Sequence, residues 1–144
     1  MKTVKDILNH KGTEVWSVTP ETKVFDALKL MADKNIGAVL VIKTGELKGI
    51  FSERDYARKV ALEGLSSRDL AVENIMSPKV LYAKPDMKVD ECMALMIGKR
   101  IRHLPVYEND KLTGIISIGD VVKEMLDHKD YMIDQLEQYI THRR

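Results

Sequence analysis

The strongest constraint on the fold of this chain is a repeat within its own sequence. The segment GIFSERD at residues 49–55 recurs as GIISIGD at residues 114–120. Residues 15–60 can be placed over residues 80–125 with a constant offset of 65 and no gap. The identities then far exceed the roughly three or four that ordinary residue usage gives by chance. The chain is therefore predicted to contain two copies of one small fold.

The length limits how independent the two copies can be. A chain of 144 residues makes one ordinary domain, or two very small units that share a core, because small units bury too little surface alone. Upstream of each copy, VKDILNHK at residues 4–11 resembles VENIMSPK at residues 72–79, so the repeat covers most of the chain. With 44% hydrophobic and 31% charged residues, the composition is typical of a globular protein.

Each copy is predicted to contain elements in the order β-α-β-β-α, which gives an α+β fold. One helix is indicated in each copy by apolar residues at i, i+3, i+4 and i+7: Val24, Ala27, Leu28 and Met31, then Val89, Cys92, Met93 and Met96. Two β-rich runs follow, joined by the polar turns KTGE and ENDK. Because proline cannot donate a ladder hydrogen bond, Pro105 indicates an edge position or a local irregularity in its strand.

Two further local patterns complete the fold prediction. Cys92 is the only cysteine, and its place in the helical stripe predicts a small buried apolar residue. After Asp127, Ile133, Leu136 and Ile140 lie at helical spacing, which predicts a terminal amphipathic helix. That helix either packs on its own chain or faces another subunit.

The doubled Ser-x-x-Asp pattern has two interpretations. In the simpler one, the serine caps a helix and the aspartate reaches back to the serine amide, as in a capping box. In the other, the helix start also binds a ligand, because its free N–H groups attract phosphate. An aspartate would repel that anion unless it accepted hydrogen bonds from ribose hydroxyls. A glycine at the start of the strand, Gly49 or Gly114, would allow close approach of the backbone, so an adenosine-type nucleotide fits this combination.

The duplication, its element order and the run RIRHLPVYENDKLTGIISIGDVV at residues 100–122 resemble a tandem pair of cystathionine β-synthase (CBS) domains, also called a Bateman module. The resemblance implies two CBS repeats, residues 6–66 and 74–130, packed with pseudo-twofold symmetry, followed by a C-terminal helix and tail at residues 131–144. It also implies clefts between the repeats that hold AMP, ADP, ATP, NAD or S-adenosylmethionine. On this basis we expect a regulatory module, such as an energy sensor, and not an enzyme.

The resemblance assigns residues to two nucleotide-binding clefts. In one cleft, Asp120 would bind the ribose with Ser117 and Gly119 nearby, and adenine would lie near Thr13, Val15, Ile36, Gly37 and Ala38. In the other cleft, the expected residues are Ser52, Arg54, Asp55, Lys79, Leu81 and Ile101, with Arg102 also beside the base.

The two copies differ at one informative place, since Gly37 and Ala38 of the first correspond to Arg102 and His103 of the second. Cationic donors improve phosphate binding, so Arg102 and His103 are candidate phosphate contacts. The alternative is that Arg102 is a solvated surface charge and His103 a partly buried residue with satisfied hydrogen bonds. If His103 assists an anion, it is also the expected source of pH sensitivity near neutrality.

The charge balance and the motifs of the chain argue against several other functions. With 23 basic and 22 acidic residues there is no global field for nucleic acid, and RIRH at 100–103 and HRR at 142–144 do not make an interleaved aromatic and basic surface. The longest apolar run, Ala38 to Ile42, cannot span a membrane, and the N-terminus has no secretory signal, so a cytoplasmic location is expected. The sequence contains no Walker A loop and no GxGxxG, HExxH or GxSxG motif, and no metal site is expected.

Two alternatives therefore stay open beside the nucleotide-binding module. One is a nucleotide-independent dimer scaffold, and the other is a nucleic-acid or protein interaction module. The family resemblance implies a homodimer. Because no effector domain is attached to the repeats, the regulated target is expected to be a separate protein.

Overall fold

A computed structural model describes residues 2–142, with side chains described for residues 2–138. The chain divides into two compact units. Residues 15–80 form the first-repeat unit, and residues 1–14 together with 81–144 form the second-repeat unit. The basic segment at 142–144, considered above for nucleic-acid binding, lies outside the residues whose side chains are described.

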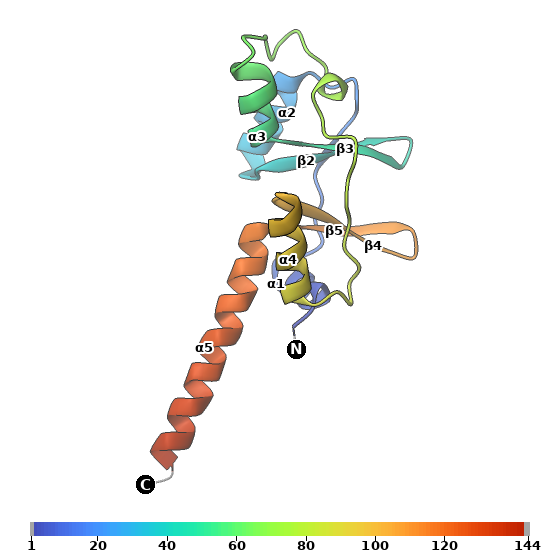
Figure 1. The fold of residues 1–144 in the computed structure, drawn as a ribbon. Helices are drawn as coiled ribbons and strands as arrows, with labels where there is room; N and C mark the ends of the chain where they lie inside the picture. Colours follow the sequence, from blue (N-terminus) through green and yellow to red (C-terminus); the bar gives the residue numbers. More distant parts are fainter. Residues whose placement is uncertain (1, 143–144) are drawn as a thin grey trace. The chain divides into compact units, whose positions relative to one another are not determined.

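The first-repeat unit contains a three-stranded sheet with helices beside it (Figure 1). Strand β2 lies in the middle, with β1 parallel to it on one side and β3 antiparallel on the other. The elements of this unit are β1 (Ser17–Val18), α2 (Val24–Lys34), β2 (Ala38–Lys43), β3 (Glu46–Ser52), α3 (Glu53–Tyr56), the π-helix η1 (Ala57–Ala61) and the 3-10 helix η2 (Val72–Asn74).

The second-repeat unit contains an antiparallel hairpin of two strands with three helices. Figure 1 shows the N-terminal helix, in blue, in this unit together with α4 and α5. The elements of this unit are α1 (Val4–Lys11), α4 (Val89–Lys99), β4 (His103–Glu108), β5 (Lys111–Ser117) and α5 (Ile118–His142).

The offset of 65 that relates the two sequences also relates the two folds, so the predicted α+β repeat is confirmed. The helices α2 and α4 begin and end at equivalent residues. In the hairpins, Ala38 is opposite Ser52 in the first unit, and His103 is opposite Ser117 in the second. Both hairpins also carry a register shift at the same place, after Val41 and after Val106.

The polar turns predicted between the strands have the backbone that a tight hairpin needs. Thr44 and Gly45 have φ values of 49° and 79°, and Asn109 and Asp110 have φ values of 52° and 61°. Positive φ at both central residues is typical of the type I′ turn, whose twist matches that of the flanking strands. Both KTGE and ENDK therefore fix the register of the strands that they join.

Pro105 explains why the two sheets differ. In the first unit, the amide of Leu40 donates to the carbonyl of Trp16 at 3.2 Å, which helps to hold β1 against β2. Pro105 is the counterpart of Leu40 and has no N–H, so the second unit cannot make the equivalent bond. The parallel strand is reduced there to a single bridge between Ala83 and Val106. The register shift is not caused by the proline, because the first unit has it too.

Each unit has a hydrophobic core of its own among the described residues. The core of the second-repeat unit includes Val4, Ile7 and Leu8 of α1, together with residues of α4, β4, β5 and α5. The core of the first-repeat unit includes Val72 and Ile75 from the segment that is equivalent to α1 in sequence. Each opening segment thus completes the core of the neighbouring sequence copy, which is how two small units each bury enough apolar surface.

Two isolated β-bridges lie just before the opening segments and join them to the units whose cores they complete. Thr3 pairs with Lys88 in the second-repeat unit, and Ala71 pairs with Lys23 in the first-repeat unit. The compact units consequently differ at their ends from the sequence repeats 6–66 and 74–130, because residues 1–14 belong with the second copy. Cys92 lies in the second core with no exposed surface, as predicted, and burial raises the pKa of its thiol to about 11.

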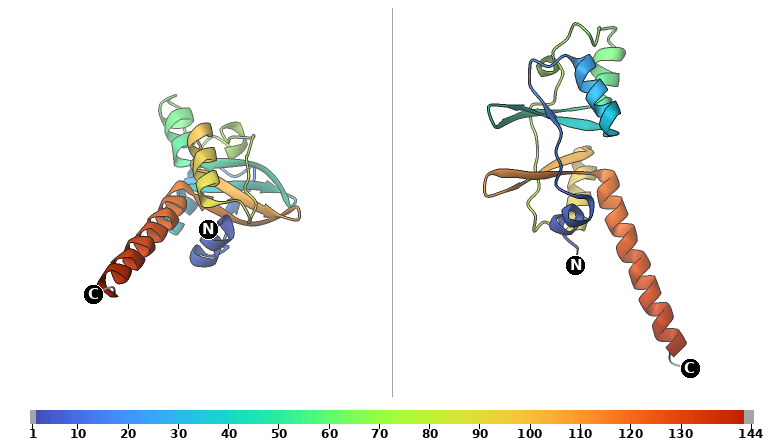
Figure 2. Two further views of the ribbon diagram at one scale, coloured as in Figure 1. Left: turned by 60° about the horizontal axis from the view of Figure 1, so that its bottom comes forward. Right: turned by 180° about the vertical axis from the view of Figure 1, so that it is seen from behind.

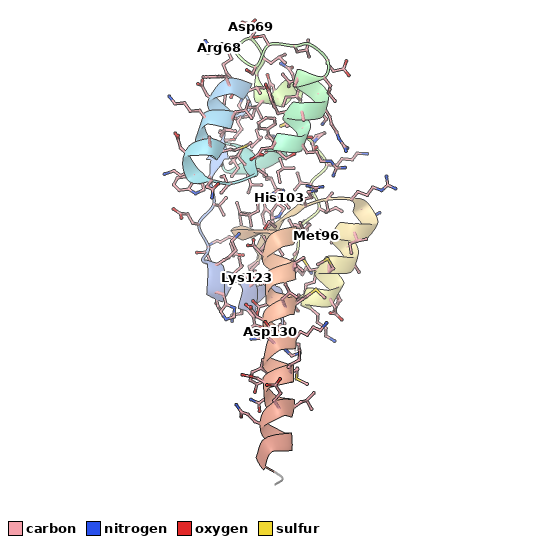
Figure 3. All side chains as sticks on the ribbon, turned by 90° about the vertical axis from the view of Figure 1, so that its left-hand side faces the viewer. Arg68, Asp69, Met96, His103, Lys123 and Asp130 are labelled. Carbon is pink, nitrogen blue, oxygen red and sulfur yellow. The ribbon has the colours of Figure 1, made fainter. Side chains whose placement is uncertain are left out.

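The two repeats end differently. In the first unit, α3 has four residues and continues into the five-residue π-helix η1. In the second unit, the repeat helix and the predicted terminal helix form a single helix, α5, of 25 residues. Figures 2 and 3 show that α5 beyond Asp130 has no other element of its unit beside it. The exposed Tyr131, Met132, Ile133 and Leu136 lie in this part of the helix.

Candidate functional site

Both Ser-x-x-Asp segments form the capping box that the simpler interpretation predicted. In the first-repeat unit, the amide of Asp55 donates to Ser52 Oγ at 3.1 Å, and the amide of Ser52 donates to Asp55 Oδ2 at 3.0 Å. In the second, the corresponding bonds between Asp120 and Ser117 are 3.1 Å and 2.8 Å long. Each box lies where the last strand of a repeat runs into a helix.

A third capping box shows that this motif alone does not identify a ligand site. At the start of α1, the amide of Thr3 donates to Asp6 Oδ2 at 2.8 Å, in a box of the same type. The hydrogen bond from the Thr3 amide also lowers the pKa of Asp6. What distinguishes Asp55 and Asp120 must therefore lie in their surroundings.

The clearest difference is a lysine on each of these two carboxylates. Lys11 Nζ lies 2.7 Å from Asp120 Oδ2 and also donates to the carbonyl of Ile115 at 2.9 Å. In the first-repeat unit, Lys59 Nζ lies 3.3 Å from Asp55 Oδ1 and donates to the carbonyl of Ile75 at 3.1 Å. Neither lysine was predicted from the sequence.

The two lysines reach their aspartates from different elements. Lys59 follows Asp55 by four residues, a spacing that could have been recognised as a helical ion pair. Lys11 is separated from Asp120 by 109 residues, and no local signal connects them. The counterpart of Lys59 in the second copy is Glu124, so α5 has no lysine at this position and the lysine comes from α1 instead.

Glu124 is itself held by α1 and the residues before it. Its side chain is almost fully buried, and Glu124 Oε2 lies 3.0 Å from His10 Nδ1. Lys2 Nζ lies 3.7 Å from the other carboxylate oxygen. The N-terminal segment thus contributes partners to both acidic groups, Asp120 and Glu124, on the first turns of α5.

The electrostatics keep Asp120 ionised. Burial by itself raises the pKa of this carboxyl, but the hydrogen bonds from Lys11 and from the Ser117 amide and side chain outweigh burial and hold the pKa below its ordinary value. An ionised carboxylate accepts hydrogen bonds only, which is the chemistry required to bind the two hydroxyl groups of a ribose.

The helix starts have fewer open amide groups than the ligand interpretation assumed. The amide of Ile118 donates to the carbonyl of Arg102 at 2.8 Å, and the amide of Asp120 is bonded to Ser117 Oγ. In the first unit, the amide of Glu53 donates to the carbonyl of Gly37 at 3.0 Å in the same way. A phosphate at α5 would therefore depend more on side-chain cations than on the backbone.

His103 begins β4 beside the start of α5 (Figure 3), and Arg102 directly precedes it in the chain. Arg102 is exposed and His103 is partly buried. Burial, followed by the positive charges of Lys11 and Arg102, lowers the pKa of His103, although Asp120 opposes the shift. His103 is consequently neutral near pH 7 in the free protein.

The strand glycines have a structural explanation. A side chain at Gly49 would lie 2.8 Å from Met76 Sδ and 2.8 Å from the Ser77 carbonyl, and one at Gly114 would lie 2.8 Å from Leu8 Cδ2. These two glycines therefore make room for the opening segments, which explains them without a ligand. At Gly119 a Cβ would meet only Ser117 Oγ, at an ordinary 3.6 Å.

The predicted cleft residues fall into the two units as follows. The second-repeat unit brings Arg102, His103, Ser117, Gly119 and Asp120 together and also contains Thr13, Leu81 and Ile101; the first-repeat unit contains Val15, Ile36, Gly37, Ala38, Ser52, Arg54, Asp55 and Lys79. Ile36 and Ile101 each pack against the core of their own unit. The assignment of residues from both units to one cleft stays a prediction.

No three His, Cys, Asp or Glu side chains among the described residues gather where they would hold a metal ion. Over the same part of the chain, no helix combines the length and apolar character needed to cross a membrane.

Comparison with known proteins decides the family. A family model for the CBS domain matches residues 4–62 and residues 72–127. The chain belongs to the CBS-domain family. CBS domain pairs are regulatory modules, and the resemblance inferred from the repeated sequence is confirmed.

Three similar proteins support the assignment to the CBS family. The CBS domain-containing protein CBSX3, mitochondrial, of Arabidopsis thaliana is 38% identical, over 96% of this chain and 71% of that protein. A solved structure of a protein with CBS domains from Burkholderia ambifaria is 50% identical with a TM-score of 0.86, over 88% of this chain and 95% of that chain. The CBS domain pair of protein MJ0100, solved with 5′-methylthioadenosine and S-adenosyl-L-methionine, is 25% identical with a TM-score of 0.75, over 86% and 99%.

Proposed function

We propose that this CBS pair is a regulatory module that binds adenine nucleotides, with the ribose on the carboxylates of Asp120 and Asp55. The observation that carries the proposal is the ionised, capped aspartate at the start of α5, with its lysine and its cationic neighbours. An adenosyl ligand is supported by the CBS pair of MJ0100, which binds two adenosyl compounds. The module reports the ligand to a separate partner protein through a change in its surface.

The charges near Asp120 favour a ligand with a phosphate, such as AMP, ADP, ATP or NAD. Lys11 and Arg102 are cations, and His103 becomes a third cation when it is protonated. Gly37 and Ala38 occupy the positions of Arg102 and His103 in the first copy and carry no charge. The Asp120 site is therefore expected to bind phosphate more strongly than the Asp55 site.

Titration calorimetry with AMP, ATP, NAD and S-adenosylmethionine tests this function. Asp120→Asn should weaken nucleotide binding at one site by about 1.5 to 3 kcal/mol, the range for a lost hydrogen bond to a charged group. Asp55→Asn should weaken the other site. Asn is preferred to Ala because it retains a side-chain oxygen that can accept the hydrogen bond from the amide of the capping serine.

The third capping box provides a matched control for this experiment. Asp6→Asn removes the same charge from the same motif at a helix start that has no proposed ligand role. It should leave nucleotide affinity unchanged. The proposal fails if the parent chain gives no heat with any of the four compounds, or if Asp120→Asn and Asp6→Asn have the same effect on binding.

We also propose that the CBS pair assembles as a homodimer through an exposed face of α5 that begins at Met125. Met125, Met132 and Leu136 lie at i, i+7 and i+11 on one face, and their exposed fractions are 40%, 47% and 58%. This spacing is that of the seam of a two-stranded coiled coil. A second copy of the same helix would cover the face with matching residues.

A further inference from the structure

The pairing of Lys11 with Asp120 carries an inference about which ligands this site accepts. The ammonium group has two acceptors, Asp120 Oδ2 at 2.7 Å and the carbonyl of Ile115 at 2.9 Å. About a third of the Lys11 side chain and a quarter of the Asp120 side chain are exposed, at 32% and 25%. The ion pair therefore lies at the surface of the unit, within reach of a ligand from solvent.

The backbone of Lys11 is fixed although its side chain is not enclosed. Lys11 is the last residue of α1, and Val4, Ile7 and Leu8 of this helix are buried in the core of the unit. The amide of Gly12 closes the helix on the carbonyl of Leu8 at 2.7 Å. Only rotation of the flexible four-carbon side chain can move the ammonium group, and the helix stays in place.

A ribose whose two hydroxyl groups use both carboxylate oxygens of Asp120 must compete with Lys11 for Oδ2. The ammonium group and the amide of Ser117 both reach the same carboxylate oxygen, Oδ2. A ligand that takes over this oxygen leaves the lysine without its ion pair. A neutral nucleoside offers the lysine no replacement, whereas the phosphate of a nucleotide offers a stronger charged acceptor.

We propose that Lys11 is a placeholder cation, which occupies Asp120 in the free protein and turns to the ligand phosphate when a ribose replaces it. The proposal rests on the proposed function and deepens it by assigning phosphate selectivity to a residue outside the repeated motif. Lys11 would then have two opposite effects, because it competes with the ribose and attracts the phosphate. Adenosine binding is weakened by Lys11, and AMP binding is strengthened.

The experiment compares AMP with adenosine by titration calorimetry in the full chain carrying Asp55→Asn, so that the Asp120 site is observed by itself. In that chain AMP should bind about tenfold or more tightly than adenosine. Lys11→Met should weaken AMP about tenfold while adenosine binds equally well or more tightly, which removes the preference. Lys11→Arg should restore the preference, since it restores the charge.

Lys5→Met is the matched control, because Lys5 is an exposed lysine on the same helix and its replacement changes the net charge equally. It should leave both affinities unchanged. If Lys11→Met weakens AMP and adenosine by the same factor, or changes neither, the placeholder role is wrong while nucleotide binding stands. If the Asp55→Asn chain binds neither compound, both the proposed nucleotide binding at Asp120 and the placeholder role of Lys11 are wrong.

Discussion

Asp6, Asp55 and Asp120 occupy the same position of the same capping box, but their carboxylates face different partners. Among the described residues, no lysine forms an ion pair with Asp6 within 4 Å. Asp55 has Lys59 at 3.3 Å, and Asp120 has Lys11 at 2.7 Å. The capping boxes could be predicted from Ser-x-x-Asp, because they depend on residues three positions apart. Lys11 could not, because its contact depends on how α1 packs against α5 and β5.

His103 gives nucleotide binding a pH dependence of known sign. Burial, Lys11 and Arg102 lower the pKa of His103 in the free protein, and a bound phosphate would raise it. Binding should therefore take up a proton, and AMP affinity should increase as the pH falls from about 8 to about 6, through the ordinary histidine range. Calorimetry in buffers of different ionisation enthalpy measures the proton uptake directly.

Two variants separate this effect from other titrations in the unit. His103→Gln should abolish both the proton uptake and the pH dependence. His10→Gln changes the histidine that contacts Glu124 and should leave them in place. A pH dependence that persists in His103→Gln would contradict the account. Without ligand, the lowered pKa means that the contribution of His103 to stability is complete above about pH 6.5 and is lost as the pH falls below it.

Gly119→Ala should affect AMP affinity without reducing the stability of the protein. A Cβ there would make only an ordinary contact with Ser117 Oγ, so the fold has room for Gly119→Ala. Alanine in the first turn of a helix should leave the melting temperature unchanged or raise stability by about 0.4 to 1 kcal/mol. AMP affinity should nevertheless decrease several-fold if the phosphate passes over this residue. Thermal unfolding and calorimetry on the same sample test both statements, and unchanged affinity would exclude Gly119 from the site.

Among the packed elements, the opening segments lie against Gly49 in one unit and Gly114 in the other, and the cost in stability of replacing these glycines should differ. At Gly49 the obstacle is partly backbone, since the Ser77 carbonyl lies 2.8 Å away and is held by the Ile50 amide at 3.0 Å. At Gly114 the obstacle is the end of the Leu8 side chain, which can rotate. Gly49→Ala should therefore destabilise the protein by about 1 to 3 kcal/mol, and Gly114→Ala by less.

Chemical denaturation of the two variants measures this difference. Leu8→Ala should also compensate for part of Gly114→Ala, so that the double variant is more stable than the sum of the single changes predicts. Equal destabilisation at the two glycines, or strict additivity of Leu8→Ala and Gly114→Ala, would show that the opening segments do not pack as described.

The sequence predicted the elements that both copies share more reliably than those in which they differ. The apolar spacing predicted α2 and α4, and the polar turns predicted the two hairpins, because each pattern lies within a short segment. The continuous α5 and the π-helix η1 follow equivalent capping boxes but differ in packing. The exchange of opening segments involves contacts such as Thr3 with Lys88, which no local pattern encodes.

For the whole molecule, the exposed apolar face of α5 leads us to expect a homodimer. Replacing Met132 and Leu136 together with glutamate should place charges on the proposed seam and convert a dimer into a monomer. Both residues are more than 45% exposed in the single chain, so the fold of the unit should not change. Light scattering measures the mass of parent and variant. A parent chain of monomer mass would contradict the proposed dimer.

A crystal structure of the chain grown with millimolar AMP would show whether the two capped aspartates bind the ribose of an adenine nucleotide. We expect ribose hydroxyl groups within hydrogen-bond distance of Asp120 Oδ2, with Lys11 moved from that oxygen to the phosphate, and weaker occupancy at Asp55. Well-ordered Asp120 and Asp55 carboxylates that keep their lysines and have no nucleotide beside them would contradict it.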